Sequence, residues 1–301
     1  MILVVGATGS LGGRIAKGLL DRREAVRVLA RPASQYASLR AAGADVAAGN
    51  LKDSSSLLRA CRGIEVVITT ASMSKRGDDT VDNVDLSGNQ HLIDAAARAG
   101  VRHLIFASTI GASETSPVPL FRAKAAAEAH LRASGMTWTV LRANAFMDVW
   151  FGMLIEMPLA AGQPVSLVGD SGRRHSFVAE SDVAAFALAA VDNPAAVNST
   201  ITIGGPEAVT LREVVRAYED AGAPRRPVRI VPSGDPLPGL PEAVGQLAAA
   251  LETFDSPIPM EQTARTYGVP LTSVAVFARA RMAAAARGQA SVQHQKKPTG
   301  L

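Results

Sequence analysis

The chain has little cysteine, few aromatic residues and no long apolar run, and each shortage excludes a class of protein. A single cysteine, Cys61, in 301 residues excludes an internal disulfide and any metal site built on a cysteine cluster. Aromatic residues make up 4% of the chain, so the aromatic surfaces that stack nucleic acid bases are not expected. No uninterrupted apolar segment is long enough to span a bilayer. We therefore expect no metal, no nucleic acid partner and no membrane partner.

The start of the chain and its charge distribution agree with the absence of membrane and nucleic acid partners. The apolar start, residues 1–5, runs directly into glycines and has neither a basic leader nor a cleavage pattern, so we expect a cytoplasmic protein. The formal net charge is +4, and much of the excess lies in the segment 286–301. This segment lacks apolar periodicity, and we expect a disordered tail. Elsewhere basic and acidic residues are interspersed, which is typical of a solvated surface.

Up to residue 143 the sequence alternates between short apolar strands and amphipathic helices. Continuous Val, Ile and Leu runs separated by helices predict a parallel sheet covered on both faces. Right-handed crossovers make this an α/β, doubly wound, Rossmann-like sheet, and we predict a dinucleotide-binding core over residues 1–143. The expected strands are 2–6, 25–31, 44–49, 65–72, 102–109 and 137–143, and the expected helices are 10–23, 34–43, 54–61, 80–100 and 120–135.

After residue 143 the alternation breaks. The patterns indicate an apolar helix, a second helix, a strand and a third helix, followed by a proline-rich connector. We predict that residues 144–285 combine late sheet elements with a small, mostly helical cap that binds substrate, and these elements need not form a contiguous second domain. The segments are, in order, 146–160, 180–192, 199–205, 210–222 and 231–241.

The segment GATGSLGG, residues 6–13, directly follows the first strand and begins a helix. In this context the glycines of such a loop bind a dinucleotide. Gly6 permits the tight turn, Gly9 lets the backbone approach a pyrophosphate, and Gly12 lets the helix pack closely on the strand. The helix N-terminus adds free N–H groups and a partial positive charge. The alternative is a glycine turn that binds nothing. We assign cofactor contacts to Gly6, Thr8, Gly9, Ser10, Leu11 and Gly12.

The end of the second strand indicates which dinucleotide is preferred. An NAD site usually places a carboxylate there, on the ribose hydroxyls. This chain has Ala30 and then Arg31, whose guanidinium can pair with a 2′-phosphate, and Arg14 could add to it. We therefore predict that NADP(H) is favoured over NAD(H). The alternative is that Arg31 is an ordinary surface arginine.

Six segments together carry a family pattern: GATGSLGG, VRVLARP, GNLKDSSSL, NQHLIDAAARAGVRHLIFAST, AKAAAEAHLRASGMTWTVLRANAFMD and RHSFVAESDVAAFALAAV. In this order they resemble the atypical short-chain dehydrogenase/reductase family, in its NmrA-like branch of NAD(P)-binding proteins. The resemblance extends to about residue 285. It implies that Asn50, where the family usually has Asp, and Leu51 lie near the adenine. It also implies that Thr70, Ala71 and Ser72 lie along the cofactor.

The same resemblance implies where the catalytic groups lie. Short-chain reductases use a serine after the fifth strand and a Tyr-x-x-x-Lys on the next helix, where the tyrosine donates a proton and the lysine holds the nicotinamide ribose. This chain has Ser108 and Lys124 at these positions but Leu120 in place of the tyrosine. We predict that Lys124 and Ser108 are catalytic and that Lys124 also binds the cofactor. The alternatives are a surface lysine paired with Glu128 and a serine hydroxyl that is bonded to the backbone.

Other side chains are candidates for binding substrate. Thr109 follows Ser108, and His175 lies in a segment that lines the active cleft of relatives; a structural histidine is the alternative. An apolar wall for an aromatic substrate is predicted from neighbouring residues in the apolar helix, and the alternative for these residues is the hydrophobic core. They are Phe146, Met147 and Trp150, together with Phe151.

These features predict an NADPH-dependent oxidoreductase that transfers hydride to a small apolar or aromatic carbonyl-type substrate. A quinone, an enone or a polyketide-derived ring of secondary metabolism would suit a site without the tyrosine. One alternative is a non-catalytic, NAD(P)-sensing regulator, which the missing tyrosine favours and the retained Lys124 opposes. Another is an enzyme that uses the bound cofactor for coupling, isomerisation or dehydration. We expect a monomer or a homodimer that binds a small-molecule substrate.

Overall fold

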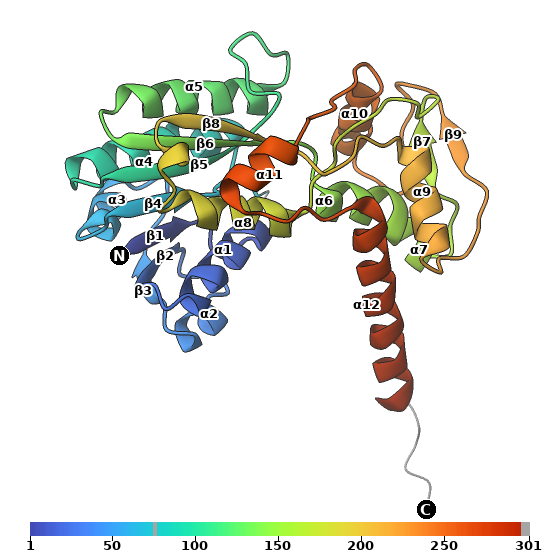
Figure 1. The fold of residues 1–301 in the computed structure, drawn as a ribbon, viewed down its shortest axis with the longest axis horizontal. Coiled ribbons are helices and arrows are strands. Elements are labelled where there is room, and N and C mark those ends of the chain that lie inside the picture. The colour runs from blue at the N-terminus through green and yellow to red at the C-terminus, as the bar shows by residue number, and fades with distance from the viewer. Residues whose placement is uncertain (75–76, 296–301) are drawn as a thin grey trace, which may run out of the picture. The chain divides into compact units, whose positions relative to one another are not determined.

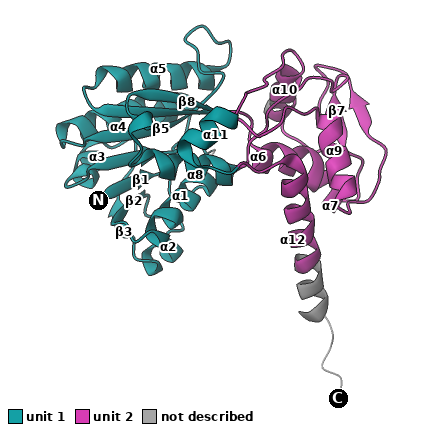
Figure 2. Cartoon of the chain, in the orientation of Figure 1, with its two compact units in different colours: residues 1–143, 180–203, 261–270 teal, residues 144–179, 204–260, 271–301 magenta. Residues whose placement is uncertain are grey.

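The computed structural model describes residues 1–74 and 77–295, and the chain divides into two compact units (Figure 2). Unit 1 contains residues 1–143, 180–203 and 261–270. Unit 2 contains residues 144–179, 204–260 and the chain from residue 271 onward. Each unit is therefore built from segments that are far apart in the sequence.

A seven-stranded parallel sheet lies at the centre of unit 1, with the strand order β3-β2-β1-β4-β5-β6-β8 (Figure 1). Strands β1 and β4 are buried along their whole length, as expected for the middle of a covered parallel sheet. The predicted doubly wound α/β fold is confirmed. The strands are β1 (Ile2–Val5), β2 (Val26–Ala30), β3 (Asp45–Ala48), β4 (Val66–Thr69), β5 (His103–Thr109), β6 (Thr137–Ala143) and β8 (Ser199–Ile203).

Helices flank this sheet, and most occupy the predicted segments. The apolar side of α3, α4 and α5 packs on strand residues to form a continuous core in which Cys61 is fully buried. Burial raises the pKa of the Cys61 thiol to about 11. The helices of unit 1 are α1 (Ser10–Asp21), α2 (Ala37–Ala41), α3 (Ser54–Cys61), α4 (Ser87–Arg98), α5 (Pro119–Ala133), α8 (Glu180–Ala190), α11 (Glu261–Tyr267) and the 3₁₀ turn η3 (Pro194–Ala196).

The segment predicted as one helix over 80–100 begins with a π-helical segment, η1 (Val81–Leu86), and continues as α4. Thr80 caps the start: its hydroxyl accepts a hydrogen bond from the N–H of Asn83, and the Asn83 side chain accepts one from the N–H of Thr80. Single π-helical turns occur frequently at functional sites. Here the wider turn carries Asp85, whose side chain is fully buried.

Unit 2 has its own hydrophobic core, centred on Phe151, Phe177 and Tyr218. Phe151 meets Phe177 edge-on at 5.1 Å between ring centroids, and it meets Tyr218 in the same way at 6.3 Å. A two-stranded parallel sheet of β7 (Ser166–Val168) and β9 (Arg229–Val231) was not predicted, because three-residue strands are too short to show a periodicity. The helices are α6 (Met147–Phe151), η2 (Gly152–Glu156), α7 (Met157–Ala160), α9 (Leu211–Asp220), α10 (Glu242–Leu251) and α12 (Val274–Gln295).

The end of the chain differs from the sequence prediction. Helix α12 continues to Gln295, so the structure assigns 286–295 to this helix instead of to a disordered tail. The helix can continue through this segment because Ala, Arg and Gln are good helix formers. The remainder of the predicted tail, residues 296–301, lies outside the described residues.

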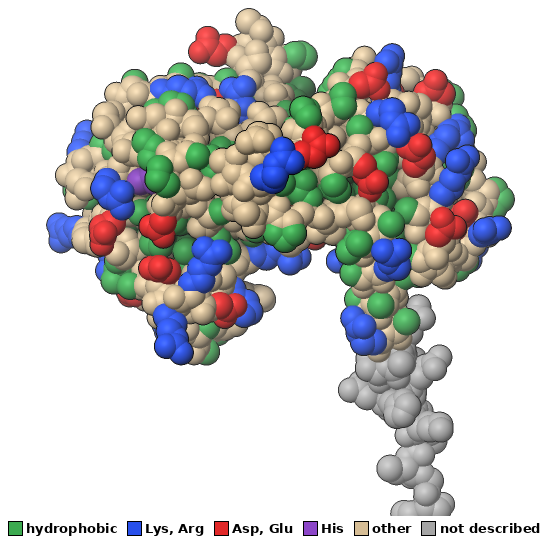
Figure 3. Space-filling model, in the orientation of Figure 1, with side chains coloured by type: hydrophobic (Ala, Val, Ile, Leu, Met, Phe, Trp, Pro, Cys, Tyr) green, Lys and Arg blue, Asp and Glu red, His purple; other side chains and the backbone are tan. Residues whose placement is uncertain are grey.

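The surface carries both signs of charge. On the face seen in Figure 3, Lys and Arg side chains alternate with Asp and Glu side chains over the elements of both units. No helix within the described residues is both long and apolar enough to cross a membrane. In the same part of the chain, no group of three or more His, Cys, Asp or Glu side chains could hold a metal ion.

Candidate cofactor pocket and catalytic groups

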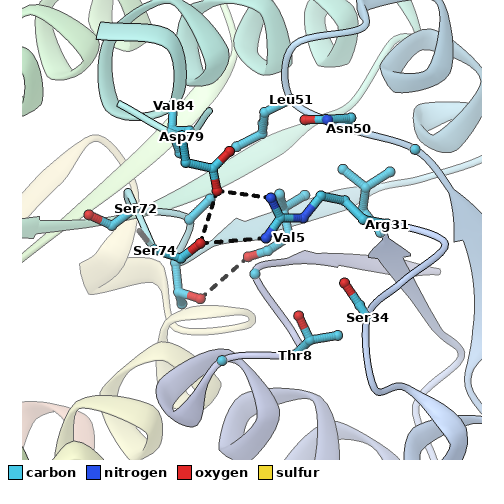
Figure 4. Close-up of a pocket in the computed structure, with 16 residues that line it drawn as sticks. Val5, Thr8, Arg31, Ser34, Asn50, Leu51, Ser72, Ser74, Asp79 and Val84 are labelled. Atoms are coloured by element: carbon cyan, nitrogen blue, oxygen red, sulfur yellow. Dashed lines mark hydrogen bonds and ion pairs between the residues drawn. The ribbon is translucent and has the colours of Figure 1, made fainter. Parts of the chain in front are cut away.

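A pocket of about 270 Å³ lies in unit 1 where β1, β2 and β4 end (Figure 4). The strand order reverses at β1, since β2 lies on one side of it and β4 on the other. Open parallel sheets bind ligands at such a switch point, outside the carboxyl ends of the strands. The lining brings together most residues that the sequence analysis assigned to the cofactor: Gly6, Thr8, Gly9, Arg31, Asn50, Leu51, Thr70, Ala71 and Ser72.

The three glycines of the first loop differ in what surrounds them. Gly6 has a φ of +86°, and a Cβ there would lie 2.6 Å from the hydroxyl oxygen of Thr70. A Cβ on Gly12 would overlap the carbonyl oxygen of Gly6. A Cβ on Gly9 would meet only that same carbonyl oxygen, at 3.3 Å. Gly6 and Gly12 are therefore required by the packing of the turn, whereas Gly9 leaves open space at the pocket.

The start of α1 is suited to an anion. Gly9 is the N-cap, the first turn has no acidic residue, and no side chain among the described residues caps this end. The first N–H groups of a helix have no partner within it, so they can bind a phosphate. The Ser10 hydroxyl donates a hydrogen bond to the carboxylate of Glu180, so only the backbone N–H of Ser10 is left to bind an anion.

Three of the predicted loop contacts, Ser10, Leu11 and Gly12, do not line the pocket. Leu11 is half-buried, and Gly12 is buried beneath the turn. Arg14 was expected to assist Arg31, but its Nε lies 3.6 Å from a carboxylate oxygen of Glu180. Arg14 therefore has a carboxylate partner of its own.

Arg31 lies in the pocket wall, where it pairs with a carboxylate that the sequence analysis missed. Its Nη1 donates to Oδ2 of Asp79 at 2.8 Å, and the side chain of Asp79 is 5% exposed (Figure 4). The Ser74 hydroxyl donates to the same oxygen at 2.9 Å, and Lys52 contacts the other at 3.2 Å. Burial is the largest influence and raises the pKa of Asp79, but these donated hydrogen bonds together lower the pKa below its usual value.

Lys124 is buried and points to a different partner from the one that helical spacing indicated. Its Nζ lies 3.2 Å from Oδ1 of Asp85, on η1. The same ammonium donates to the carbonyl oxygens of Ala71, at 3.2 Å, and Ala107, at 3.4 Å. The ring of Phe106 lies 5.0 Å away, within the range of a cation–π contact. The surface-lysine alternative is therefore wrong, and the ammonium of Lys124 has three protein acceptors within 3.4 Å.

Ser108 is bonded to Glu128, which is fully buried on α5. The Ser108 hydroxyl donates to Oε1 of Glu128 at 2.6 Å, while Arg142 and Arg132 donate to its Oε2 at 2.7 and 2.9 Å. Burial is again the largest influence and raises the pKa of Glu128, but the hydrogen bonds from Arg142, Ser108 and Arg132 lower it overall. Since the carboxylate holds the Ser108 proton, Ser108 is left as a hydrogen-bond acceptor.

The candidates for binding substrate separate into two groups. Thr109, Phe146 and Trp150 are half-buried. Met147 is fully buried in the core of unit 2, so for this residue the core alternative holds. His175 is 1% exposed.

Both ring nitrogens of His175 have hydrogen-bond partners within unit 2. One nitrogen contacts the Ser256 hydroxyl at 2.7 Å, and the other contacts the carbonyl oxygen of Leu251 at 3.0 Å. Phe177 and Phe254 pack edge-on against the ring. Burial lowers the pKa of His175. The prediction that His175 contacts substrate is therefore corrected: a buried, doubly bonded imidazole has no nitrogen left for a ligand.

Comparison with known proteins extends these observations. The sequence profile of the NmrA-like family matches residues 1–232. A curated relative, NAD(P)H azoreductase of Xenophilus azovorans, is 29% identical over 94% of this chain and 99% of its own length. Photosystem II assembly factor Ycf39 of Cyanophora paradoxa is 31% identical over 77% of this chain and 71% of its own length.

A solved structure shows the same fold. The NADPH-dependent quinone oxidoreductase QOR2 of Escherichia coli superposes with a TM-score of 0.77 and is 21% identical, covering 94% of this chain and all of that one. The profile match spans well over half of the residues and includes the complete glycine loop and pocket. The protein therefore belongs to the NmrA-like family, as its sequence predicted.

Proposed function

We propose that the protein binds NADP(H) in the pocket of unit 1 and reduces a small apolar or aromatic carbonyl-type substrate. The observation that carries the proposal is the glycine turn at the switch point. Gly9 lines the pocket where a side chain would fill it, and the uncapped start of α1 lies beside it. A backbone that no side chain shields from the pocket, next to free N–H groups, fits a pyrophosphate.

The other lining residues fit the remaining parts of a dinucleotide. Asn50 and Leu51 would hold the adenine, and Arg31 would pair with the 2′-phosphate. Thr70, Ala71 and Ser72 would lie along the cofactor beyond the pyrophosphate. When bound, the nicotinamide supplies a hydride. The relative that matches nearly the full chain is named as an NAD(P)H-dependent reductase, which supports the same assignment.

The side chains near the strand ends indicate the substrate class. Leu120 stands in place of the usual tyrosine and has no proton to give. The Ser108 hydroxyl donates its hydrogen bond to Glu128, so it does not readily supply a proton to a substrate. Hydride transfer to a carbonyl-type substrate creates a negative charge on oxygen. A substrate that spreads this charge by conjugation needs less help from an acid. A quinone, an enone or a polyketide-derived ring meets this condition, and the last would place the reaction in secondary metabolism.

Two measurements on the purified protein test the proposal. Titration followed by nicotinamide fluorescence should show that NADPH binds. With NADPH bound, absorbance should then report its oxidation by quinones or enones and little oxidation by simple ketones. If neither dinucleotide binds, the proposal is wrong at its first step.

A cofactor-sensing protein without turnover is the second candidate function. The arrangement around Lys124 favours it, because Asp85 and the carbonyl groups of Ala71 and Ala107 already engage the ammonium. A curated relative named as an assembly factor, with no reductase activity in its name, is consistent with this alternative. Tight NADPH binding without oxidation across the whole substrate panel would favour the sensor over the enzyme.

A further inference from the structure

We propose that Asp79 limits the preference for NADPH that Arg31 creates, so that the pocket also accepts NADH. This inference rests on the proposed function, because it concerns the ribose end of the same dinucleotide. The end of β2 carries no carboxylate of its own, since residue 30 is an alanine. The fold supplies one from a distant segment of the chain, 48 residues beyond Arg31.

Asp79 is built into the pocket wall. It lines the same pocket as Arg31 and Ser34, and its carboxylate accepts bonds from Arg31 and Ser74 at 2.8 and 2.9 Å. The Arg31 side chain is 34% exposed and that of Asp79 is 5% exposed. Figure 4 shows the guanidinium and the carboxylate facing each other across this part of the pocket. The guanidinium that would attract a 2′-phosphate therefore already has an anionic partner.

The local charges favour neither dinucleotide strongly. Lys52 contacts both Asp79, at 3.2 Å, and Asp78, at 2.5 Å. Arg31 and Lys52 together are thus balanced by two carboxylates. A 2′-phosphate carries additional negative charge, so it must compete with Asp79 for Arg31 and is repelled by the same carboxylate.

A ribose that carries a free 2′-hydroxyl interacts differently. A carboxylate accepts a hydrogen bond from such a hydroxyl, which is how NAD sites use an acidic residue. Asp79 can serve this purpose while it keeps its bonds to Arg31 and Ser74, since each carboxylate oxygen accepts more than one hydrogen bond. The same side chain therefore weakens the binding of NADPH and supports that of NADH.

The test compares dissociation constants for NADPH and NADH, measured by fluorescence titration of the full chain. Asp79→Asn keeps the shape of the side chain and removes its charge. The dissociation constant should therefore fall about tenfold for NADPH and rise about tenfold for NADH. Asp78→Asn is the matched control: it removes the same charge at the residue next to Asp79, and the Asp78 side chain is 85% exposed. The ratio of the two constants should change little in this control.

The outcomes separate the two proposals. If the parent protein binds neither dinucleotide, the proposed function fails. If it binds them and Asp79→Asn changes the ratio no more than Asp78→Asn does, the role of Asp79 is overturned. Arg31→Ala gives a second measurement in which Asp79 is unchanged. This variant should bind NADPH more weakly than the parent protein does, and NADH as well as before or more tightly. An equal loss of affinity for both dinucleotides would also overturn the inference.

Discussion

At the scale of single residues, Lys124 shows how burial changes the interpretation of a candidate catalytic side chain. Its ammonium is buried, and the nearest charge is the fully buried carboxylate of Asp85 at 3.2 Å. Asp85 is in turn held by the Ser72 hydroxyl, at 2.7 Å, and by the N–H of Met73, at 2.9 Å. Ser72 and Ala71 line the pocket but Lys124 does not, so Lys124 is connected to the candidate site through Asp85 and Ser72 and through its bond to the carbonyl oxygen of Ala71.

We expect Lys124→Ala to lower turnover by about 10²-fold, the lower range for a positioned acid or base. The same change leaves Asp85 buried without its cation, which destabilises a protein by about 3–5 kcal/mol. Lys124→Arg should restore little activity, because a planar guanidinium does not match the geometry of an ammonium. Steady-state NADPH oxidation and urea unfolding, measured on the same samples, give the two quantities.

The double variant Lys124→Ala with Asp85→Asn separates catalysis from stability. It removes both charges, so most of the stability should return while the turnover stays low. Near-normal turnover in Lys124→Ala, with unchanged affinity for the cofactor, would move the catalytic role away from α5.

At the scale of elements, the junction of β1 and α1 decides whether the pocket can form. The junction is short, and the N–H of Gly9 bonds to the carbonyl oxygen of Gly6 at 2.9 Å, which closes the turn. Gly12, one helical turn further along, packs against the same carbonyl group. The strand, the turn and the helix therefore form one unit in which two glycines serve packing and Gly9 serves the ligand.

Substitutions at the two helix-side glycines should have different consequences. Gly9→Val places a branched side chain at the pocket, so cofactor binding should be lost while the melting temperature changes little. Gly12→Val forces a side chain into the Gly6 carbonyl group, so the variant should unfold at a clearly lower temperature. Thermal unfolding and NADPH titration would be run on both variants. A folded Gly9→Val protein that still binds NADPH would contradict the assignment of this loop.

At the scale of the whole molecule, stability should depend on pH through buried side chains more than through the surface. His103 on β5 is 2% exposed, and its Nε2 lies 2.8 Å from the Thr139 hydroxyl on β6. That hydroxyl donates to the carbonyl oxygen of Ala196 at 2.6 Å, so the imidazole must be the donor in the pair. Burial, with a smaller contribution from the charge of Arg102, lowers the pKa of His103 from 6.5 to about 4.

Because its pKa is lowered in the folded chain, His103 contributes its full stabilisation above pH 6.5. This contribution is progressively lost as the pH falls below 6.5. The unfolded chain takes up the proton as the pH falls toward 4, whereas the folded chain does not, and the loss reaches about 3 kcal/mol. Urea unfolding at a series of pH values should show this decline. His103→Gln should flatten it between pH 6.5 and 4. Parallel curves for the parent protein and His103→Gln would contradict the prediction.

Local patterns in the sequence determined the sheet of unit 1 and its first loop. Continuous apolar runs and helical periodicity depend on neighbouring residues alone, which is why β1 to β6 and the helices between them were predictable. The glycine turn was predictable for the same reason, since Gly6, Gly9 and Gly12 act within a single short segment.

The tertiary structure alone decided which charges meet. Asp79 reaches Arg31 across 48 residues, Lys124 pairs with Asp85 instead of with Glu128, and both nitrogens of His175 are bonded within unit 2. No sequence spacing encodes such pairs, because their partners come together only when parallel strands align their carboxyl ends and distant segments pack into one core. A side chain's chemistry is set by its neighbours in space, so the sequence determined the scaffold and the fold determined the partners of its charged groups.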